Sequence, residues 1–211
     1  MIVERMTFNL KYGKEDESAA IWKEMTSHLT EVGSQRDLHA RFYSCLSGRL
    51  CVSVQDLMLK SINDHNPMMY YWSINPRVQE LYRQFTELCD TSRRDMFKVE
   101  CEVGNVQKVN GMVCVRDTFL LHFGKAKDSI ALWKEILDGA TNAGVQSARM
   151  LTDVVGQSYT LVIEALYPPL NDFNPKIPFW NTNENLKSLH QKFIPLCAQA
   201  ERDLFQIEHD F

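Results

Sequence analysis

The second half of this chain repeats the first half. With Met1 placed over Met112, the segment Trp22-Lys23-Glu24 falls on Trp133-Lys134-Glu135. About thirty of about a hundred aligned positions agree, tryptophans and glycines among them, which is the mark of a duplicated folding unit. We therefore divide the 211 residues into a first unit over 1–103, a linker over 104–111 and a second unit over 112–211.

Each unit predicts the same order of elements. Residues 2–12 alternate between apolar and polar side chains, which is typical of a half-buried strand, and Gly13-Lys14 then turns the chain. Residues 17–32 have apolar side chains about one turn apart, which predicts a helix. Asn75-Pro76 predicts the start of a second helix, because Asn caps a helix well and Pro suits its first position. The remaining strands are expected at 36–46, 49–57 and 95–103.

This order, β-α-β-β-α-β, is the ferredoxin-like pattern of an α+β fold. Its four-stranded sheet carries both helices on one face and leaves the other face open. An open, partly apolar face needs a partner, and the second copy supplies one. We therefore predict two tandem ferredoxin-like units that pack their sheets face to face as an intrachain pseudo-dimeric α/β barrel.

Composition excludes several classes of protein. The formal net charge of −4 argues against a nucleic-acid partner, which usually requires a basic excess. The six cysteines form no C-x-x-C pair, so no metal site is expected. No apolar stretch predicts a membrane span, and no signal peptide is evident at the start, so we expect a cytoplasmic protein with reduced thiols.

The most specific motif is Asn63-Asp64-x-Asn66-Pro67, repeated as Asn171-Asp172-x-Asn174-Pro175. It has two interpretations. The loop could form the polar rim of a pocket, with Asp64 or Asp172 as a catalytic base and Asn66 or Asn174 as ligand-binding groups. Alternatively, these short side chains could bond their own backbone and shape a long turn. Retention in both copies favours the second interpretation.

Two further pairs recur in both copies. Trp72 and Trp180 precede the second helix of each unit, where each could close the core or form an aromatic wall for a flat apolar ligand. Arg5 and Arg116 lie on the first strand of each unit. They could form a symmetric salt-bridge network between the sheets, or bind an anionic ligand inside the barrel.

Positions at which the copies differ are the better candidates for chemistry, since one copy can keep the scaffold while the other specialises. A histidine is the usual acid or base near neutral pH. Three histidines stand where the other copy has a different residue: His65 faces Phe173, His122 faces Lys11, and His190 faces Tyr82.

The sequence resembles the dimeric α/β-barrel superfamily, and within it the NIPSNAP-type domains. The resemblance is carried by Gly13-Lys14 and Gly124-Lys125, by the tryptophan in each first helix, and by the segments 72–88 and 180–196. The superfamily includes cofactor-independent monooxygenases, polyketide cyclases, small haem-degrading oxygenases and proteins without known activity. It therefore implies a fold and a pocket rather than one reaction.

This chain departs from one arrangement of residues that is found in the superfamily. In the small haem-degrading oxygenases, a Trp and a His spaced as Trp180 and His190 are completed by an Asn on the first strand. Here Asn9 belongs to the first copy, whereas the Trp and His belong to the second. Haem binding or degradation therefore ranks last among the alternatives.

The sequence leads to a ranked hypothesis for function. The first is a protein that binds a small, largely apolar organic molecule and acts, if it is an enzyme, as a monooxygenase, cyclase or isomerase without a cofactor. The second is a non-enzymatic interaction or scaffold protein, with a homodimer beyond the intrachain pseudo-dimer. The predicted catalytic residues are His65, Asp64, His122, His190 and Asp172. The predicted ligand-binding residues are Asn66, Trp72, Asn174, Trp180, Arg5 and Arg116.

Overall fold

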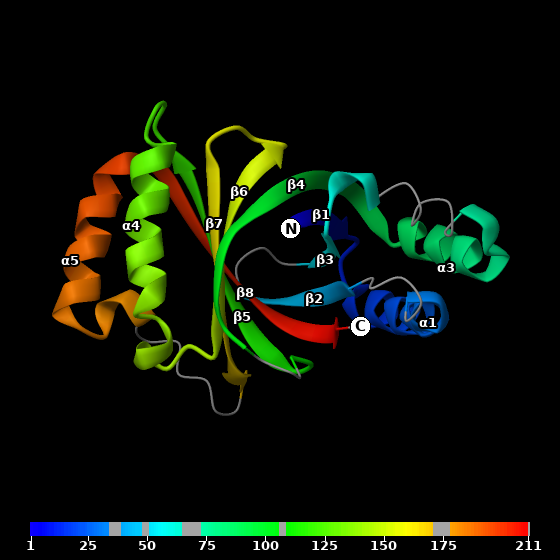
Figure 1. The fold of residues 1–211 in the computed structure, drawn as a ribbon. Coiled ribbons are helices and arrows are strands. Elements are labelled where there is room, and N and C mark those ends of the chain that lie inside the picture. Colours follow the sequence, from blue (N-terminus) through cyan, green and yellow to red (C-terminus); the bar gives the residue numbers. More distant parts are fainter. Residues whose placement is uncertain (34–38, 48–50, 65–72, 106–108, 171–177, 211) are drawn as a thin grey trace.

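The fold is described here from a computed structural model that covers residues 1–33, 39–47, 51–64, 73–105, 109–170 and 178–210. Eight antiparallel strands close into one barrel in the order β1-β3-β2-β8-β5-β7-β6-β4 (Figure 1). The α+β fold and the pseudo-dimeric barrel predicted from the sequence are confirmed. The first unit contributes β1 (Ile2–Leu10), β2 (His39–Ser47), β3 (Val52–Leu59) and β4 (Cys89–Gly104), and the second contributes β5 (Met112–Leu121), β6 (Ser147–Val155), β7 (Thr160–Pro169) and β8 (Cys197–Asp210).

The two sheets meet along their edges as well as across the lumen. The last strand of each unit pairs with the first strand of its own unit and also with the second strand of the other unit, so β4 pairs with β1 and β6, and β8 pairs with β5 and β2. The two seams between the units, β4–β6 and β8–β2, close the barrel. The long reach of β4, which begins at Cys89 rather than near residue 95, allows it to pair with β1 and with β6.

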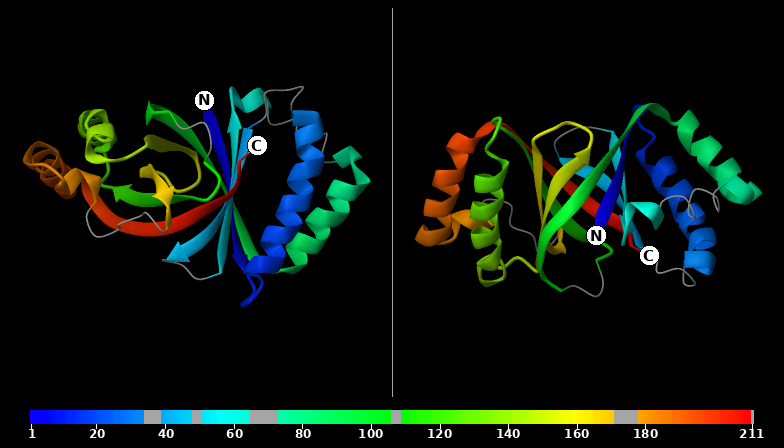
Figure 2. Two further views of the ribbon diagram at one scale, coloured as in Figure 1. Left: turned by 90° about the horizontal axis from the view of Figure 1, so that it is seen from below. Right: turned by 45° about the horizontal axis from the view of Figure 1, so that its top comes forward.

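Helices cover the outside of the barrel on two opposite sides (Figures 1 and 2). The helices α1 (Glu15–Gly33) and α3 (Pro76–Glu87) pack on the first unit, and α4 (Ala126–Asp138) and α5 (Glu184–Phe193) pack on the second. Short 3-10 turns lie at Ile62–Asp64 (η1), Thr141–Ala143 (η2), Phe179–Asn181 (η4) and Ile194–Leu196 (η5). No helix in these ranges is long and apolar enough to cross a membrane.

Strand alternation separates two kinds of core. On β1, Phe8 and Leu10 face the helices and pack with Trp22 of α1 and Phe85 of α3. The matching core of the second unit surrounds Trp133. The residues that alternate with these, such as Val3 and Arg5 on β1, face the lumen of the barrel. The lumen contains apolar clusters and a set of buried charges. The predicted turn after the first strand is confirmed, since Gly13 and Gly124 have φ values of +76° and +77°.

The second helix of each unit begins as the sequence predicts. The side chain of Asn75 accepts hydrogen bonds from the backbone N–H groups of Arg77 and Val78, and Pro76 takes the first helical position. In the second unit, Asn183 accepts from the N–H of Leu186. The two caps fix where α3 and α5 start, and therefore which residues of these helices face the sheet.

Candidate functional site

Five of the predicted site residues lie outside the described residues. They are His65, Asn66, Trp72, Asp172 and Asn174, and they stay predictions. The remaining six are Asp64, His122, His190, Trp180, Arg5 and Arg116, and the structure distributes them over four separate places.

Asp64 and His122 lie on the surface. The carboxylate of Asp64 accepts a hydrogen bond of 2.7 Å from the backbone N–H of Ser61, three residues earlier, so it bonds the local backbone. His122 is exposed just after β5, where its backbone bonds Leu196 and Lys125. Neither side chain lines either of the two pockets described below.

Arg5 and Arg116 lie in the middle of the lumen, in an ionic cluster. Arg5 donates two bonds of 2.7 Å to Asp56 and one of 2.5 Å to Glu164. Arg116 Nε donates to Glu164 at 2.5 Å, while Arg149 bonds both carboxylates at 2.6 Å. The arrangement matches the predicted salt-bridge network between the sheets. All five side chains are buried.

The cluster holds its carboxyl groups ionised. Burial alone would raise the pKa of Glu164, but the charges of Arg149, Arg5 and Arg116 lower it well below its usual value. Burial likewise opposes ionisation of Asp56, and Arg5 lowers the pKa of this group. Tyr43 donates to Asp56 at 3.1 Å, and burial raises its pKa, so the phenol stays protonated.

Three members of this cluster, Asp56, Glu164 and Arg149, are not among the predicted site residues, although the sequence carries a signal for them. Asp56 and Glu164 are 108 residues apart, the offset that also relates Gly48 to Gly156 in the repeat. Each is the one charged residue of its strand, and β3 is buried along its length while β7 is buried from Thr160 to Leu166. A charge retained at one place in two buried strands predicts a buried partner. Arg149 has the same offset from Arg41.

His190 and Trp180 lie together on the outside of the second unit. Their rings stack with centroids 5.0 Å apart and planes inclined by 23°. Trp133 and Phe193 also contact the imidazole, each with a centroid distance of 6.1 Å. The histidine lines a pocket of about 250 Å³ between α5, β5 and the start of β8. Its other walls are mainly apolar: Phe119, Phe193, Ile194, Cys197, Ala198 and Ala200, with Gln199.

The imidazole of His190 is favoured in its neutral form. Burial is the main cause of a lowered pKa, and the nearby positive charge of Arg202 lowers it further. Arg202 lies over the Trp180 ring at 4.9 Å and is held by Asp117 through bonds of 2.7 and 3.1 Å. The ring nitrogens of His190 make no hydrogen bond within the described residues, which leaves them available to a bound molecule.

The first unit builds a different environment at the equivalent place. Tyr82 stands where His190 does, and burial raises its pKa. Asn9, the residue that the haem-degrading arrangement would need, donates its side-chain amide to Thr91 in this unit. The corresponding residue of the second unit is Leu120. Neither unit therefore contains the Trp, His and Asn of the haem-degrading arrangement together. The pocket of about 250 Å³ is also too small to enclose a haem macrocycle.

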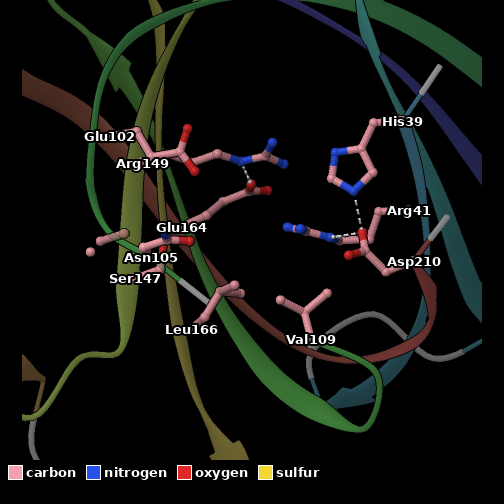
Figure 3. A pocket seen from close by; sticks show the side chains of 12 residues that line it. His39, Arg41, Glu102, Asn105, Val109, Ser147, Arg149, Glu164, Leu166 and Asp210 are labelled. Atoms are coloured by element: carbon pink, nitrogen blue, oxygen red, sulfur yellow. Dashed lines mark hydrogen bonds and ion pairs between the residues drawn. The ribbon is translucent and has the colours of Figure 1, made fainter. Parts of the chain in front are cut away.

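A second and larger cavity, of about 430 Å³, opens at one end of the barrel (Figure 3). His39 and Arg41 of β2 and Asp210 of β8 lie on one wall, while Glu102 of β4 and Arg149 of β6 lie on the other. Asp210 accepts a bond of 2.9 Å from Arg41 Nε, and its carboxylate lies 2.7 Å from His39 Nε2. Burial opposes the ionisation of Asp210, yet the bond with His39 and the charge of Arg41 lower its pKa.

Within the part of the chain that the structure describes, no group of three or more His, Cys, Asp or Glu side chains could hold a metal ion. No protein-family model matches the sequence. No curated protein matches it either.

Solved structures match the fold over almost the full chain. A provisionally assigned monooxygenase from Fusobacterium nucleatum matches with a TM-score of 0.74 at 11% identity, covering 99% of this chain and 93% of its own. This is the dimeric α/β-barrel fold, formed here by one chain. A provisionally assigned monooxygenase from Lactobacillus acidophilus matches this barrel with a TM-score of 0.72 at 5% identity, covering 99% and 94%. An anthrone oxidase-like protein matches it with a TM-score of 0.67 at 9% identity, covering 100% and 92%.

At these identities the likeness concerns the fold. The dimeric α/β-barrel fold predicted from the sequence is confirmed, and two of these neighbours are described as monooxygenases. Membership of the superfamily stays a prediction. The narrower likeness to NIPSNAP-type domains stays a prediction.

Proposed function

We propose that this barrel binds a small, largely apolar organic molecule in the pocket beside α5, with His190 as its acid–base group. One observation carries the proposal: a neutral imidazole, without a hydrogen-bond partner among the described residues, lines an apolar pocket of about 250 Å³. A few polar groups in a mainly apolar pocket are typical of small-molecule sites. The stacked Trp180 fixes the plane of the imidazole and adds an aromatic surface next to it.

The chemistry that suits this pocket begins with proton transfer. A neutral imidazole can take a proton from an acidic C–H or O–H group of the bound molecule and become an imidazolium ion. The resulting anion would lie in a mainly apolar pocket near the guanidinium of Arg202, whose charge favours it. Cyclisation and isomerisation can both start from such an anion, and the proton then returns from His190.

We place a cofactor-independent oxidation first among these reactions. The fold neighbours described as monooxygenases and as anthrone oxidase-like support this choice. In an oxidation, the substrate anion would give up electrons to molecular oxygen, which is the oxidant that the proposal requires. His190 would take only the proton.

The test is a ligand screen followed by one variant pair. Thermal shifts against polyketide-like phenols and terpenoids identify a binder, because a ligand that binds the native state raises its stability. His190→Phe keeps an aromatic ring against Trp180 but removes the base. We expect it to abolish the absorbance change that marks deprotonation of a bound phenol. Tyr82→Phe, at the equivalent place in the first unit, is the matched control and should keep that change.

Two outcomes would count against this function. If no apolar compound shifts the unfolding temperature, or if the two variants behave alike, the scaffold hypothesis takes its place. That hypothesis also includes a homodimer beyond the intrachain barrel, which light scattering on the purified chain checks directly. A Soret band on added haem, lost in His190→Phe, would instead support the haem alternative.

A further inference from the structure

The cavity at the end of the barrel has its own symmetry. Three pairs of lining residues are related by the 108-residue offset of the repeat: His39 and Ser147, Arg41 and Arg149, Glu102 and Asp210. Strand register agrees with this relation, because Arg41 lies opposite Asp210 on one seam and Arg149 lies opposite Glu102 on the other. The cavity therefore lies between the two seams of the barrel, about equally on both units.

The side chains do not follow this symmetry. As a result, the terminal nitrogens of Arg41 and the carboxylate of Glu102 make no hydrogen bond to the described residues. Arg41 stays at the cavity wall, and among the described residues its guanidinium is bonded only through Nε, to Asp210. Arg149 turns into the lumen instead, where Glu164, Asp56 and Tyr43 take its nitrogens. Glu102 thus loses the arginine opposite it and has no side-chain partner within the described ranges.

Arg41 offers a cationic fork to the cavity. Its terminal nitrogens make no hydrogen bond to the described residues, and they point into the cavity (Figure 3). The residue is 9% exposed, so this charge is largely shielded from solvent by protein. Two parallel N–H groups of a guanidinium match the two oxygens of a carboxylate.

The charges beneath the cavity also favour an anion. The linked inner cluster contains three guanidinium groups, of Arg5, Arg116 and Arg149, against the carboxylates of Asp56 and Glu164. The Arg41–Asp210 pair adds one charge of each sign. Within these two sets the guanidinium groups outnumber the carboxylates by one, which favours an anion beside Arg41, although the buried carboxylates of Asp95 and Asp203 lie opposite Arg5 and Arg116 on neighbouring strands.

Glu102 and His39 define the other end of the ligand. Glu102 is exposed at the opposite wall and can accept from a hydroxyl or ammonium group. His39 lies at the mouth with its side chain 44% exposed and its Nε2 held by Asp210. We infer that this cavity is a second ligand site, separate from the pocket beside α5, for a small polar carboxylic acid that carries a hydroxyl or amino group.

The binding experiment uses the intact chain and three probes, namely lactate, alanine and acetate, with chloride at matched ionic strength. Calorimetry should detect lactate or alanine binding, and acetate should bind at least about tenfold more weakly because it lacks the second group. Arg41→Gln should weaken binding of the preferred acid by at least about tenfold, and Arg41→Lys should weaken it less, since charge remains without the fork. Glu102→Gln should weaken alanine more than lactate.

Controls separate binding from folding. Glu102→Gln changes an exposed residue, and His39→Ser introduces the residue that the second unit already has, so both keep the test open if the Arg41 variants do not fold. Arg83→Gln, on the exposed face of α3, should bind the acids as the parent chain does. His190→Phe should also leave acid binding unchanged, which distinguishes this site from the pocket beside α5.

The inference is overturned if none of the three acids binds at millimolar concentrations. It is equally overturned if chloride gives the same response as the acids, which would indicate an adventitious ion only. Binding that survives both Arg41→Gln and Glu102→Gln at full strength would place the acid elsewhere on the molecule and would refute the assignment.

Discussion

Arg5 of the first unit donates a hydrogen bond of 2.5 Å to Glu164 of the second, between residues 159 positions apart in the sequence. Both side chains are buried. Glu164 also accepts from Arg116 and Arg149, so one carboxylate bonds three guanidinium groups from both halves of the chain. Removal of this carboxylate should therefore destabilise the barrel more than the loss of any surface ion pair.

Replacing Glu164 by Gln should lower the free energy of unfolding by about 3 kcal/mol, because buried guanidinium groups then lack their counter-charge. Urea unfolding followed by circular dichroism measures the effect. Glu87→Gln is the matched control, since Glu87 pairs with Arg83 on the exposed surface of α3 and should change the stability little. Equal losses in the two variants would contradict the central role of Glu164.

The carboxylate of Glu164 should also make the free energy of unfolding depend on pH in the acid range. Its folded pKa lies below the ordinary value of 4.5, so the folded state binds fewer protons than the unfolded chain. Its contribution is therefore complete above about pH 4.5 and is lost as the pH falls through the folded pKa. The difference in unfolding free energy between the parent chain and Glu164→Gln should be constant above that pH and shrink below it. A difference that grew with acid would be inconsistent with the ion pairs.

His190 should titrate below the ordinary value of 6.5 in the folded protein. Burial causes most of this shift and Arg202 adds to it, so Arg202→Gln should raise the pKa toward 6.5. The imidazole resonances of the native chain, followed by NMR against pH, give the value. Arg94→Gln changes the equivalent arginine of the first unit and should leave the His190 curve in place. An unshifted curve in Arg202→Gln would remove Arg202 from the site.

The helix caps allow a comparison between the two units. Asn75→Ala and Asn183→Ala should each cost about 1 kcal/mol, since each removes the acceptor for backbone N–H groups at the start of a helix. Replacement of either residue by Gly should lower the free energy of unfolding by only about a few tenths of a kcal/mol. Chemical unfolding of the four variants checks both values. If Ala and Gly behave alike, the side-chain bonds contribute little to these helices.

Patterns that repeat along the chain were sufficient to predict the architecture. The caps Asn75 and Asn183 and the glycine turn at Gly13 each express a local preference, and the structure agrees with them. Alternation correctly predicted the strand β1 but not its burial on both faces, because the lumen of the barrel covers the face with Val3 and Arg5. The barrel fold followed from the order of these elements and from their repetition. Local signals were strong because each of them occurs twice.

The sites were harder to predict because they depend on closure of the barrel. Asp210 and Arg41 meet only through the register between β2 and β8, which no local pattern specifies. The buried charges of β3 and β7 could have been noticed, since Asp56 and Glu164 occupy equivalent places in the repeat. Of the residues selected by comparing the copies, His190 lies in a pocket, whereas His122 lies exposed after β5.

The last strand of each unit also pairs with the second strand of the other unit, and this pairing affects how the chain reaches its native state. Arg41 and Asp210, neighbours on the β2–β8 seam, are separated by 169 positions. Proteins rich in such distant contacts have high contact order and fold slowly. During synthesis the first unit must wait with the edge of β2 uncovered until residues 197–210 have been made. The nascent chain is therefore most vulnerable to aggregation in that interval.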